Sequence, residues 1–199
     1  MGRRSVHTPD ELREHIIRAA TELITTSGLS GLSAREVARR IGYSPGTIYN
    51  VFVNLDDLIL TIEARMLDDL DKTLEAIPKG PDSREHLLRL AEAYLNFMHE
   101  NPRLWNLLFE HHLPAGVDVP AAYLEKLEGL LARIEDALRP LANTTDEDEV
   151  KRRSRVLWAG VHGITSLSTA DKLSTVTAEA AWPLVRDLVE TYLAGLVPR

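Results

Sequence analysis

Residues that start helices recur close together between positions 33 and 54 of this 199-residue chain. Ser33, Ser44 and Asn54 are residue types that cap helix N-termini. A helix N-terminus presents free backbone N–H groups, which together with the helix dipole favour a phosphate group. Three such termini near one another predict a surface that binds several phosphates.

The side chains between these caps suit the same target. Thr47, Tyr49 and Asn50 carry hydroxyl and amide groups that can bond to phosphates or to base edges. Gly46 has no side chain, so a nucleic-acid backbone could approach it closely. Arg35, one turn into the preceding helix, could donate to O6 and N7 of a guanine. This pattern predicts contact with double-stranded DNA.

Charge along the chain follows the same division. Residues 1–52 hold seven Arg and five acidic residues, which gives +2, and the remainder gives −9 of the total −7. Arg3 and Arg4 form a short basic arm that could enter a minor groove. Arg39 and Arg40 are expected further back, in solvent. A basic head on an acidic body indicates a polyanion-binding part that is separate from the rest.

The segment ARRIGYSPGTIYNVF, residues 38–52, contains the break that would position these groups. Gly42 is expected to end one helix in the left-handed conformation, and Ser44 followed by Pro45 starts the next. Two short helices across such a turn have helix-turn-helix geometry, whose second helix enters the major groove. The alternative is a plain structural corner. The apolar residues expected in the core are Ile48, Phe52 and Val51.

The rest of the chain reads as helix throughout, with apolar residues at helical spacing and no alternating strand. Capping residues and proline at first helical positions mark most of the starts. The fold class predicted is all-α, with about nine helices. These are expected at 9–27, 34–41, 45–51, 55–77, 83–100, 102–112, 120–139, 147–170 and 179–196. The last could begin nearer Trp182, because Pro183 fits a first turn better than a helix interior.

Composition excludes several classes of protein. The chain has no cysteine, so disulfide scaffolds and Cys-ligated zinc are excluded. No apolar run reaches the roughly 18 residues of a membrane span, and no apolar segment follows the basic N-terminus as in a signal peptide. We therefore expect a cytoplasmic, nucleoid-associated protein that has no membrane partner.

No enzyme motif is present. The sequence lacks repeated Glu-x-x-His pairs, a nucleophile elbow, a phosphate loop and a His-Glu-x-x-His motif. Adjacent His111 and His112 would point in different directions on a helix, so they do not predict a shared metal site. We expect no enzymatic activity, no cofactor and no metal.

Residues 9–58 resemble the DNA-binding domain of the TetR family of transcriptional regulators. The matching features are a long first helix that leads into SGLSGLSAREVARRIGYSPGTIYNVFVNLDDLI, the Ala-Arg-Gly spacing of the second helix, the GTIY segment of the recognition helix, and aromatic Phe52 before the next helix. The DNA contacts implied by this resemblance are Arg35, Tyr43, Ser44, Gly46, Thr47, Tyr49 and Asn50. Family members commonly place a phosphate-binding Lys at the start of the fourth helix, where this chain has Leu55.

The resemblance implies a three-helix helix-turn-helix domain at 1–54 and a ligand-binding and dimerisation domain at 55–199. Trp158, His162 and Gly163 resemble a Trp-His-Gly signature of one C-terminal domain type. Two C-terminal helices with apolar stripes would pair with their copies in a C2 dimer. The dimer-interface candidates are Leu157, Val161, Ile164, Val185, Leu188, Val189, Tyr192 and Leu196. Packing within one subunit is the alternative.

A cavity for a small, largely apolar effector is also implied by the resemblance. Its candidate lining residues are Met66, Tyr94, Phe97, Met98, Trp105, Leu108, Phe109, Trp158 and His162. Aromatic and methionine side chains at helical spacing are equally typical of an ordinary core. His162 fits a hydrogen-bonded interior residue at least as well as a ligand contact.

The function expected from the sequence is therefore a ligand-responsive transcriptional repressor. A homodimer would bind palindromic operator DNA through residues 34–51 and leave it when the effector binds. One alternative is a helical dimeric adaptor with weakened DNA binding, which the acidic charge and Leu55 favour. Activation in place of repression is another.

Overall fold

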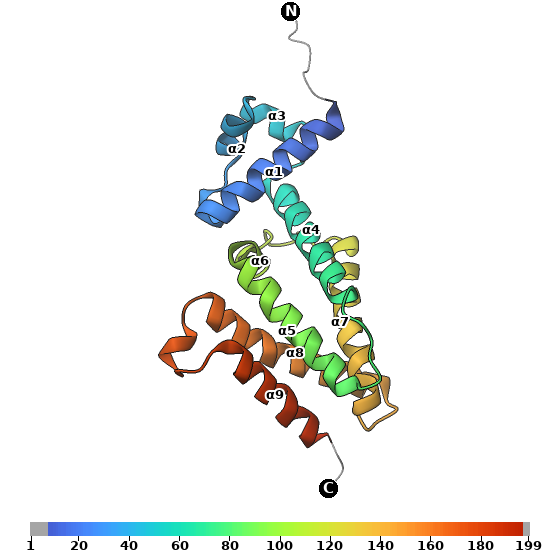
Figure 1. The fold of residues 1–199 in the computed structure, drawn as a ribbon. Helices are drawn as coiled ribbons and strands as arrows, with labels where there is room; N and C mark the ends of the chain where they lie inside the picture. Colours follow the sequence, from blue (N-terminus) through green and yellow to red (C-terminus); the bar gives the residue numbers. More distant parts are fainter. Residues whose placement is uncertain (1–7, 197–199) are drawn as a thin grey trace, which may run out of the picture. The chain divides into compact units, whose positions relative to one another are not determined.

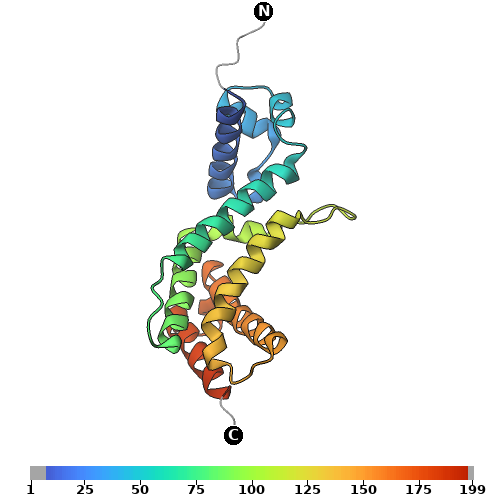
Figure 2. The same cartoon turned by 90° about the vertical axis from the view of Figure 1, so that its right-hand side faces the viewer.

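The computed structural model describes residues 8–196, and within this range the chain is all-helical, with nine α-helices and no strand. Figures 1 and 2 show the helices in two views. Their bounds are α1 Pro9–Ser27, α2 Ala34–Ile41, α3 Pro45–Tyr49, α4 Leu55–Glu75, α5 Ser83–Glu100, α6 Pro102–Glu110, α7 Ala121–Leu138, α8 Glu147–Thr169 and α9 Ala181–Gly195. The all-α class predicted from the sequence is confirmed.

Most predicted helix bounds agree with the structure to within two residues. The starts of α1, α5 and α8 are capped by Thr8, Asp82 and Asp146, whose side chains each accept a backbone N–H bond. The last helix begins at Ala181, which places Pro183 in the first turn, where its missing N–H has no intrahelical partner to lose.

Residues 8–66 and 103–123 belong to one compact unit. Its core is formed by α1, α2 and α3, and it also includes Leu58, Ile59 and Ile62 of α4 and Leu107 of α6. The N-terminal unit is therefore larger than the 1–54 domain expected from the sequence. The reason is that three helices with one short apolar face each bury too little surface without further helices to cover them.

The turn between α2 and α3 forms as predicted. Gly42 has φ 75° and ψ 29°, the left-handed conformation that a residue with a Cβ rarely adopts. Figure 1 shows α2 and α3 as consecutive short helices on either side of this turn.

The segment Ser33-Ala34-Arg35-Glu36 has the sequence of a capping box, and Ser44 before Pro45 predicts a second cap, but in the structure two details differ. The Ser33 hydroxyl accepts from the Glu36 N–H at 3.2 Å, but the Glu36 carboxylate binds Arg39 and does not reach back to the cap. Ser44 occupies the cap position of α3 without a side-chain cap bond. Its Oγ lies 3.2 Å from Thr47 Oγ1 instead.

Residues 67–102 and 124–196 form the second compact unit. α8 and α9 pack together in it, and α5 contacts both of them (Figure 1). A Cβ built on Gly160 of α8 would lie 2.8 Å from a methyl group of Leu188 on α9. Glycine at this position therefore allows the close approach of α8 and α9.

Candidate DNA-binding surface and effector cavity

The polar residues of α3 face solvent while its apolar residue faces the core. Ile48 is fully buried, whereas Gly46, Tyr49 and Asn50 are exposed and Thr47 is half-buried. Because α3 is only five residues long, its conformation depends on this anchoring more than on helix propensity. The helix thus presents hydroxyl groups outward, and Asn50 directly after it adds an amide group.

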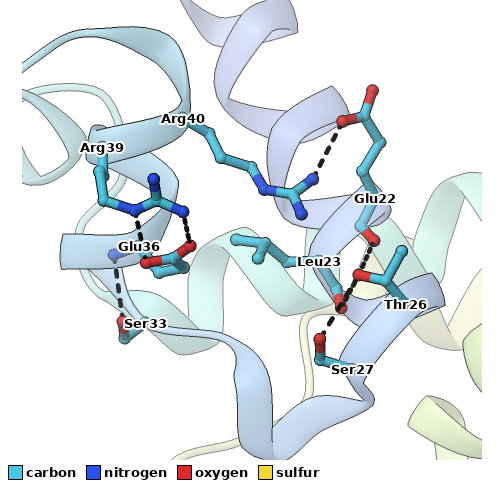
Figure 3. Close-up of polar contacts among 8 residues, drawn as sticks. All are labelled: Glu22, Leu23, Thr26, Ser27, Ser33, Glu36, Arg39 and Arg40. Atoms are coloured by element: carbon cyan, nitrogen blue, oxygen red, sulfur yellow. Dashed lines mark hydrogen bonds and ion pairs between the residues drawn. The ribbon is translucent and has the colours of Figure 1, made fainter.

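The three arginines of α2 differ in their partners. Figure 3 shows two of them, Arg39 and Arg40, with the carboxylates that they bind. Arg39 binds the Glu36 carboxylate, with Nε 2.9 Å from Oε2. Arg40 reaches Glu22 of α1 at 3.2 Å. Arg35 is exposed, and it forms no ion pair with any residue between 8 and 196. Arg35 is therefore the arginine of α2 whose charge is available to an external anion.

Of the other residues predicted to contact DNA, Ser44 is exposed and Tyr43 is half-buried. All seven belong to the turn, to the two helices beside it or to the residue after α3, so the structure brings them together in one unit. The basic arm at Arg3 and Arg4 lies outside the described residues.

Leu55 is half-buried and packs against the core of the N-terminal unit. It begins α4, where Asn54 Oδ1 accepts from the Asp57 N–H at 2.8 Å. Leu55 therefore adds to the support of the helix-turn-helix and offers no charge to phosphate. The adjacent Val53 is 86% exposed, and this apolar side chain beside α3 was not singled out in the sequence.

Arg13 of α1 also holds the end of the helix-turn-helix in place. Its guanidinium lies 4.3 Å from the centre of the Phe52 ring, a cation–π distance. Its N–H groups lie 3.4 Å from the Val51 carbonyl and from the Thr61 hydroxyl. No local pattern predicts this role, because the partners are 38 to 48 residues away in the chain.

The second unit contains a small apolar cavity of about 40 Å³. Its lining comes from α4, α5, α7, α8 and α9. The lining residues are Leu74, Leu87, Leu90, Ala91, Tyr94, Arg133, Ile134, Leu157, Trp158, Val161 and Val189.

Two of the nine residues predicted to line a cavity do so, namely Tyr94 and Trp158. His162 is joined to them, since its Nδ1 lies 2.9 Å from the Tyr94 hydroxyl and its ring stacks on Trp158. The other six do not line it: Met66, Phe97, Met98, Trp105, Leu108 and Phe109. Met66, Phe97, Met98 and Trp105 are buried, Leu108 is half-buried and Phe109 is 47% exposed.

Burial perturbs the polar groups beside this cavity. It raises the pKa of the Tyr94 phenol and lowers the pKa of His162, because both charged forms lose hydration. The pair is therefore held as a neutral hydrogen-bonded unit, as an interior histidine would be.

Four of the predicted dimer-interface residues are part of one chain's own core. Leu157, Val161, Val185 and Val189 are at most 5% exposed, so they offer no surface to a second copy. Ile164, Leu188, Tyr192 and Leu196 are half-buried. A wide apolar stripe covers both the inner and the side faces of a helix, which is why sequence spacing alone could not separate them.

The outward face of α8 is instead lined by Val156, Ala159, Gly163 and Leu167. Val156 and Leu167 are 50% and 42% exposed, and the two small residues between them are also exposed. The spacing of three or four residues keeps all four on one side of the helix.

Within residues 8–196, no helix is long and apolar enough to cross a membrane. No group of three or more His, Cys, Asp or Glu side chains in this range could hold a metal ion.

Two known protein families match this chain, one in its N-terminal part and one in its C-terminal part. The family "Bacterial regulatory proteins, tetR family" matches residues 16–62. The family "Tetracyclin repressor-like, C-terminal domain" matches residues 87–192, more than half of the chain.

Individual proteins with similar sequences or folds are also known. An uncharacterised HTH-type transcriptional regulator of Mycobacterium tuberculosis is 24% identical over 197 residues, covering 98% of this chain and 87% of that protein. A protein of unknown function from Rhodococcus sp. RHA1 has a TM-score of 0.76 and 20% identity, with both chains fully covered. The structure of Thermus thermophilus FadR, a TetR-family repressor in complex with lauroyl-CoA, has a TM-score of 0.66 and 21% identity, covering 94% of this chain and 96% of that one.

Proposed function

Because this chain belongs to the TetR family of transcriptional regulators, we propose that it is a homodimeric repressor that releases palindromic operator DNA when a small effector binds. The observation that carries the proposal is the exposed Arg35 beside the outward polar face of α3. In this position Arg35 and Asn50 can reach base edges while Thr47 and Tyr49 bind phosphate.

The size of the apolar cavity supports a ligand-driven change. A volume of about 40 Å³ holds little more than one or two water molecules. An effector with several carbon atoms can enter only if the lining side chains move apart. Such a ligand binds the expanded state of the cavity more tightly than the contracted state. A ligand can shift a conformational equilibrium only through such a difference in affinity.

The effector class that we propose is a small, largely apolar molecule. The cavity lining is apolar except for Arg133 and the hydroxyl and ring nitrogen groups of Tyr94 and Trp158. The similar FadR of Thermus thermophilus holds lauroyl-CoA, which makes molecules with an acyl chain the first candidates to test.

The outward stripe of α8, Val156, Ala159, Gly163 and Leu167, is the dimer surface that we propose. Small residues at its centre allow a second copy of α8 to approach closely, and the apolar residues at its ends would be buried by the contact. Two copies of the helix-turn-helix would then read two half-sites, spaced by about one helical turn of DNA or a multiple of it.

The test is fluorescence anisotropy of the full chain with labelled DNA that flanks its own gene, followed by addition of octanoyl and lauroyl compounds. We expect saturable binding that weakens as salt rises, because protein contacts displace condensed counterions from the phosphates. We also expect a protected palindrome in footprinting and loss of anisotropy with at least one acyl compound.

The same measurement addresses the alternatives. If the protein is a dimer but shows no saturable DNA binding at low salt, the adaptor function is supported. The acidic charge and the absence of a basic residue at position 55 favour this alternative. Stronger DNA binding on effector addition would support activation and contradict the release that we propose.

A further inference from the structure

A second, polar cleft adjoins the apolar cavity in the same unit. It has a volume of about 560 Å³ and lies among the C-terminal part of α4, the following 77–80 segment, the start of α5 and the end of α7. The cleft and the cavity share three lining residues, Leu74, Leu90 and Arg133. A single molecule could therefore extend from one into the other.

The acidic residues around the cleft have cationic partners, but not every cationic residue there has an acidic partner within the described chain. Its two acidic residues lie near arginines, since Glu75 is 3.7 Å from Arg133 and Asp136 is 3.8 Å from Arg139. Arg133 also binds Asp71 with two hydrogen bonds. In contrast, Lys79 lines the cleft and forms no ion pair with any residue in the described range 8–196.

Arg89 is a second cation without a carboxylate partner in that range. It lies directly beneath the cleft wall, because a Cβ built on Gly80 would come within 2.8 Å of its terminal nitrogen. Its Nε is buried and has no hydrogen-bond partner. A buried guanidinium N–H without a partner loses hydration without compensation, so a ligand oxygen or a water molecule there would lower its free energy.

His86 adds a second buried polar atom without a hydrogen-bond partner among the described residues. Its side chain lines the cleft, the residue is 8% exposed, and its Nδ1 has no hydrogen-bond partner. Burial lowers the pKa of His86, and the nearby charge of Arg89 lowers it further. His86 is therefore a neutral polar group close to two unmatched cations, Arg89 and Lys79.

We propose that this cleft binds the anionic head of an amphipathic effector whose apolar tail occupies the adjoining cavity. Lys79 attracts the negative group, and the charge of Arg89 below the cleft wall adds to this attraction. The inference rests on the proposed function, since it assigns a head-group site to the same effector. The effector class is thereby narrowed from an apolar molecule to one with a carboxylate or phosphate at one end.

The experiment compares three probes with the same eight-carbon tail: octanol, octanoate and octyl phosphate. Each is titrated calorimetrically into the full chain, and its effect on bound DNA is followed by anisotropy in parallel. The variant is Lys79→Glu, which reverses the exposed charge at the cleft. The matched control is Lys72→Glu, a charge reversal at an exposed lysine on α4 that lines neither space.

We expect at least one anionic probe to bind the unaltered chain about tenfold more tightly than octanol, and Lys79→Glu to remove this difference. Lys72→Glu should keep it. Tight binding of octanoate would identify a carboxylate head, and tight binding of octyl phosphate alone would identify a phosphate head.

Equal affinity for octanol and both anions would overturn the head-group site, as would equal losses in the two lysine variants or no binding of any probe. DNA binding in the same samples is measured without any probe. It therefore reports separately on the proposed function, and the two failures remain distinguishable.

Discussion

Single side chains decide how the helix-turn-helix can meet DNA. Arg39 and Arg40 pair with the carboxylates of Glu36 and Glu22, so a phosphate would have to compete with these carboxylates for them. Arg35 is exposed without such a partner in the described chain. The number of arginines on α2 is thus a poor guide to its DNA-binding charge, and the pairing of each one matters more.

Arg35→Ala is expected to weaken operator binding by about 1–3 kcal/mol and to relax specificity at one base position. The reason is the loss of a donor pair to a base edge with no internal contact disturbed. Anisotropy titrations against operator variants measure both effects, and Arg39→Ala is the matched control. A larger loss in Arg39→Ala than in Arg35→Ala would contradict this role.

Arg13→Met should destabilise the N-terminal unit by about 1–2 kcal/mol, because a side chain of similar length loses the ring contact and two hydrogen bonds. Thermal unfolding followed by circular dichroism measures the change. Arg18→Met, at an exposed position of α1, controls for loss of charge. Equal melting temperatures in the two variants would show that the contacts of Arg13 do not stabilise the N-terminal unit.

The helices themselves were largely predictable, because each start carries a local signal. Thr8 before Pro9, Asp82 and Asp146 marked α1, α5 and α8 correctly. Ends were harder, as α3 shows by stopping at Tyr49 where the sequence suggested residue 51. No glycine or proline marks that stop, and anchoring of Ile48 and Phe52 in the core decides it.

One ion pair between helices has a buried acidic partner. Glu135 of α7 is 7% exposed and its carboxylate accepts from Arg155 of α8 at 2.7 Å. Arg155→Ala would leave this carboxylate buried without its cation, at a cost of about 3 kcal/mol in the free energy of unfolding. Arg186→Ala removes an exposed pair with Glu190 on α9 and should cost about 0.5 kcal/mol or less. Urea unfolding compares the two, and similar costs would rule out a special role for the α7–α8 pair.

The stability that the first turn of α8 contributes should decrease at acidic pH. The Arg152 guanidinium, assisted by that of Arg153, lowers the pKa of Glu149 to about 2. A carboxyl group whose pKa is lowered on folding contributes stability above its unfolded value near 4.3, and this contribution is lost as pH falls toward 2.

Glu149→Gln should therefore lower the melting temperature at pH 6 more than at pH 3, where the carboxyl group of the unaltered chain is largely protonated in the unfolded state but still largely ionised in the folded state. Melting curves at the two pH values provide the measurement. A deficit that is the same at both would show that the carboxylate charge is not responsible.

At the scale of the whole molecule, the fold depends on contacts between residues far apart in the sequence, and no local pattern predicts these contacts. The inclusion of Leu107 in the core of the N-terminal unit, and the orientation of Val185 and Val189 toward their own chain, required the folded structure. The helical class followed from periodicity, and charge indicated a separate N-terminal part, whereas the bounds 1–54 and 55–199 came from the family resemblance. The cavity lining did not, because Tyr94 and Met98 look alike as apolar positions of one helix and only Tyr94 reaches it.

Assembly of two copies is tested by Gly163→Arg. A side chain at this position meets nothing within 4 Å in its own chain, so the variant should fold, while the charge would block approach of a second α8. We expect a monomer by light scattering and operator affinity reduced by about 10²-fold or more, as the two half-sites lose their linkage.

Gly129→Arg is the matched control, because it adds the same side chain to another helical glycine with open space around it. It should remain dimeric and bind DNA normally. A dimeric Gly163→Arg protein would show that copies associate elsewhere.

The extension of the N-terminal unit into α4 and α6 bears on the engineering of chimeric biosensors. A hybrid regulator that borrows only residues 1–54 would omit Leu58, Ile59, Ile62 and Leu107, which are at most 4% exposed in this unit. The transferred DNA-binding fragment would then expose apolar surface and unfold at a lower temperature. A donor fragment that keeps α4 through Met66, with an acceptor chosen for a compatible α6, is the cut that this architecture allows.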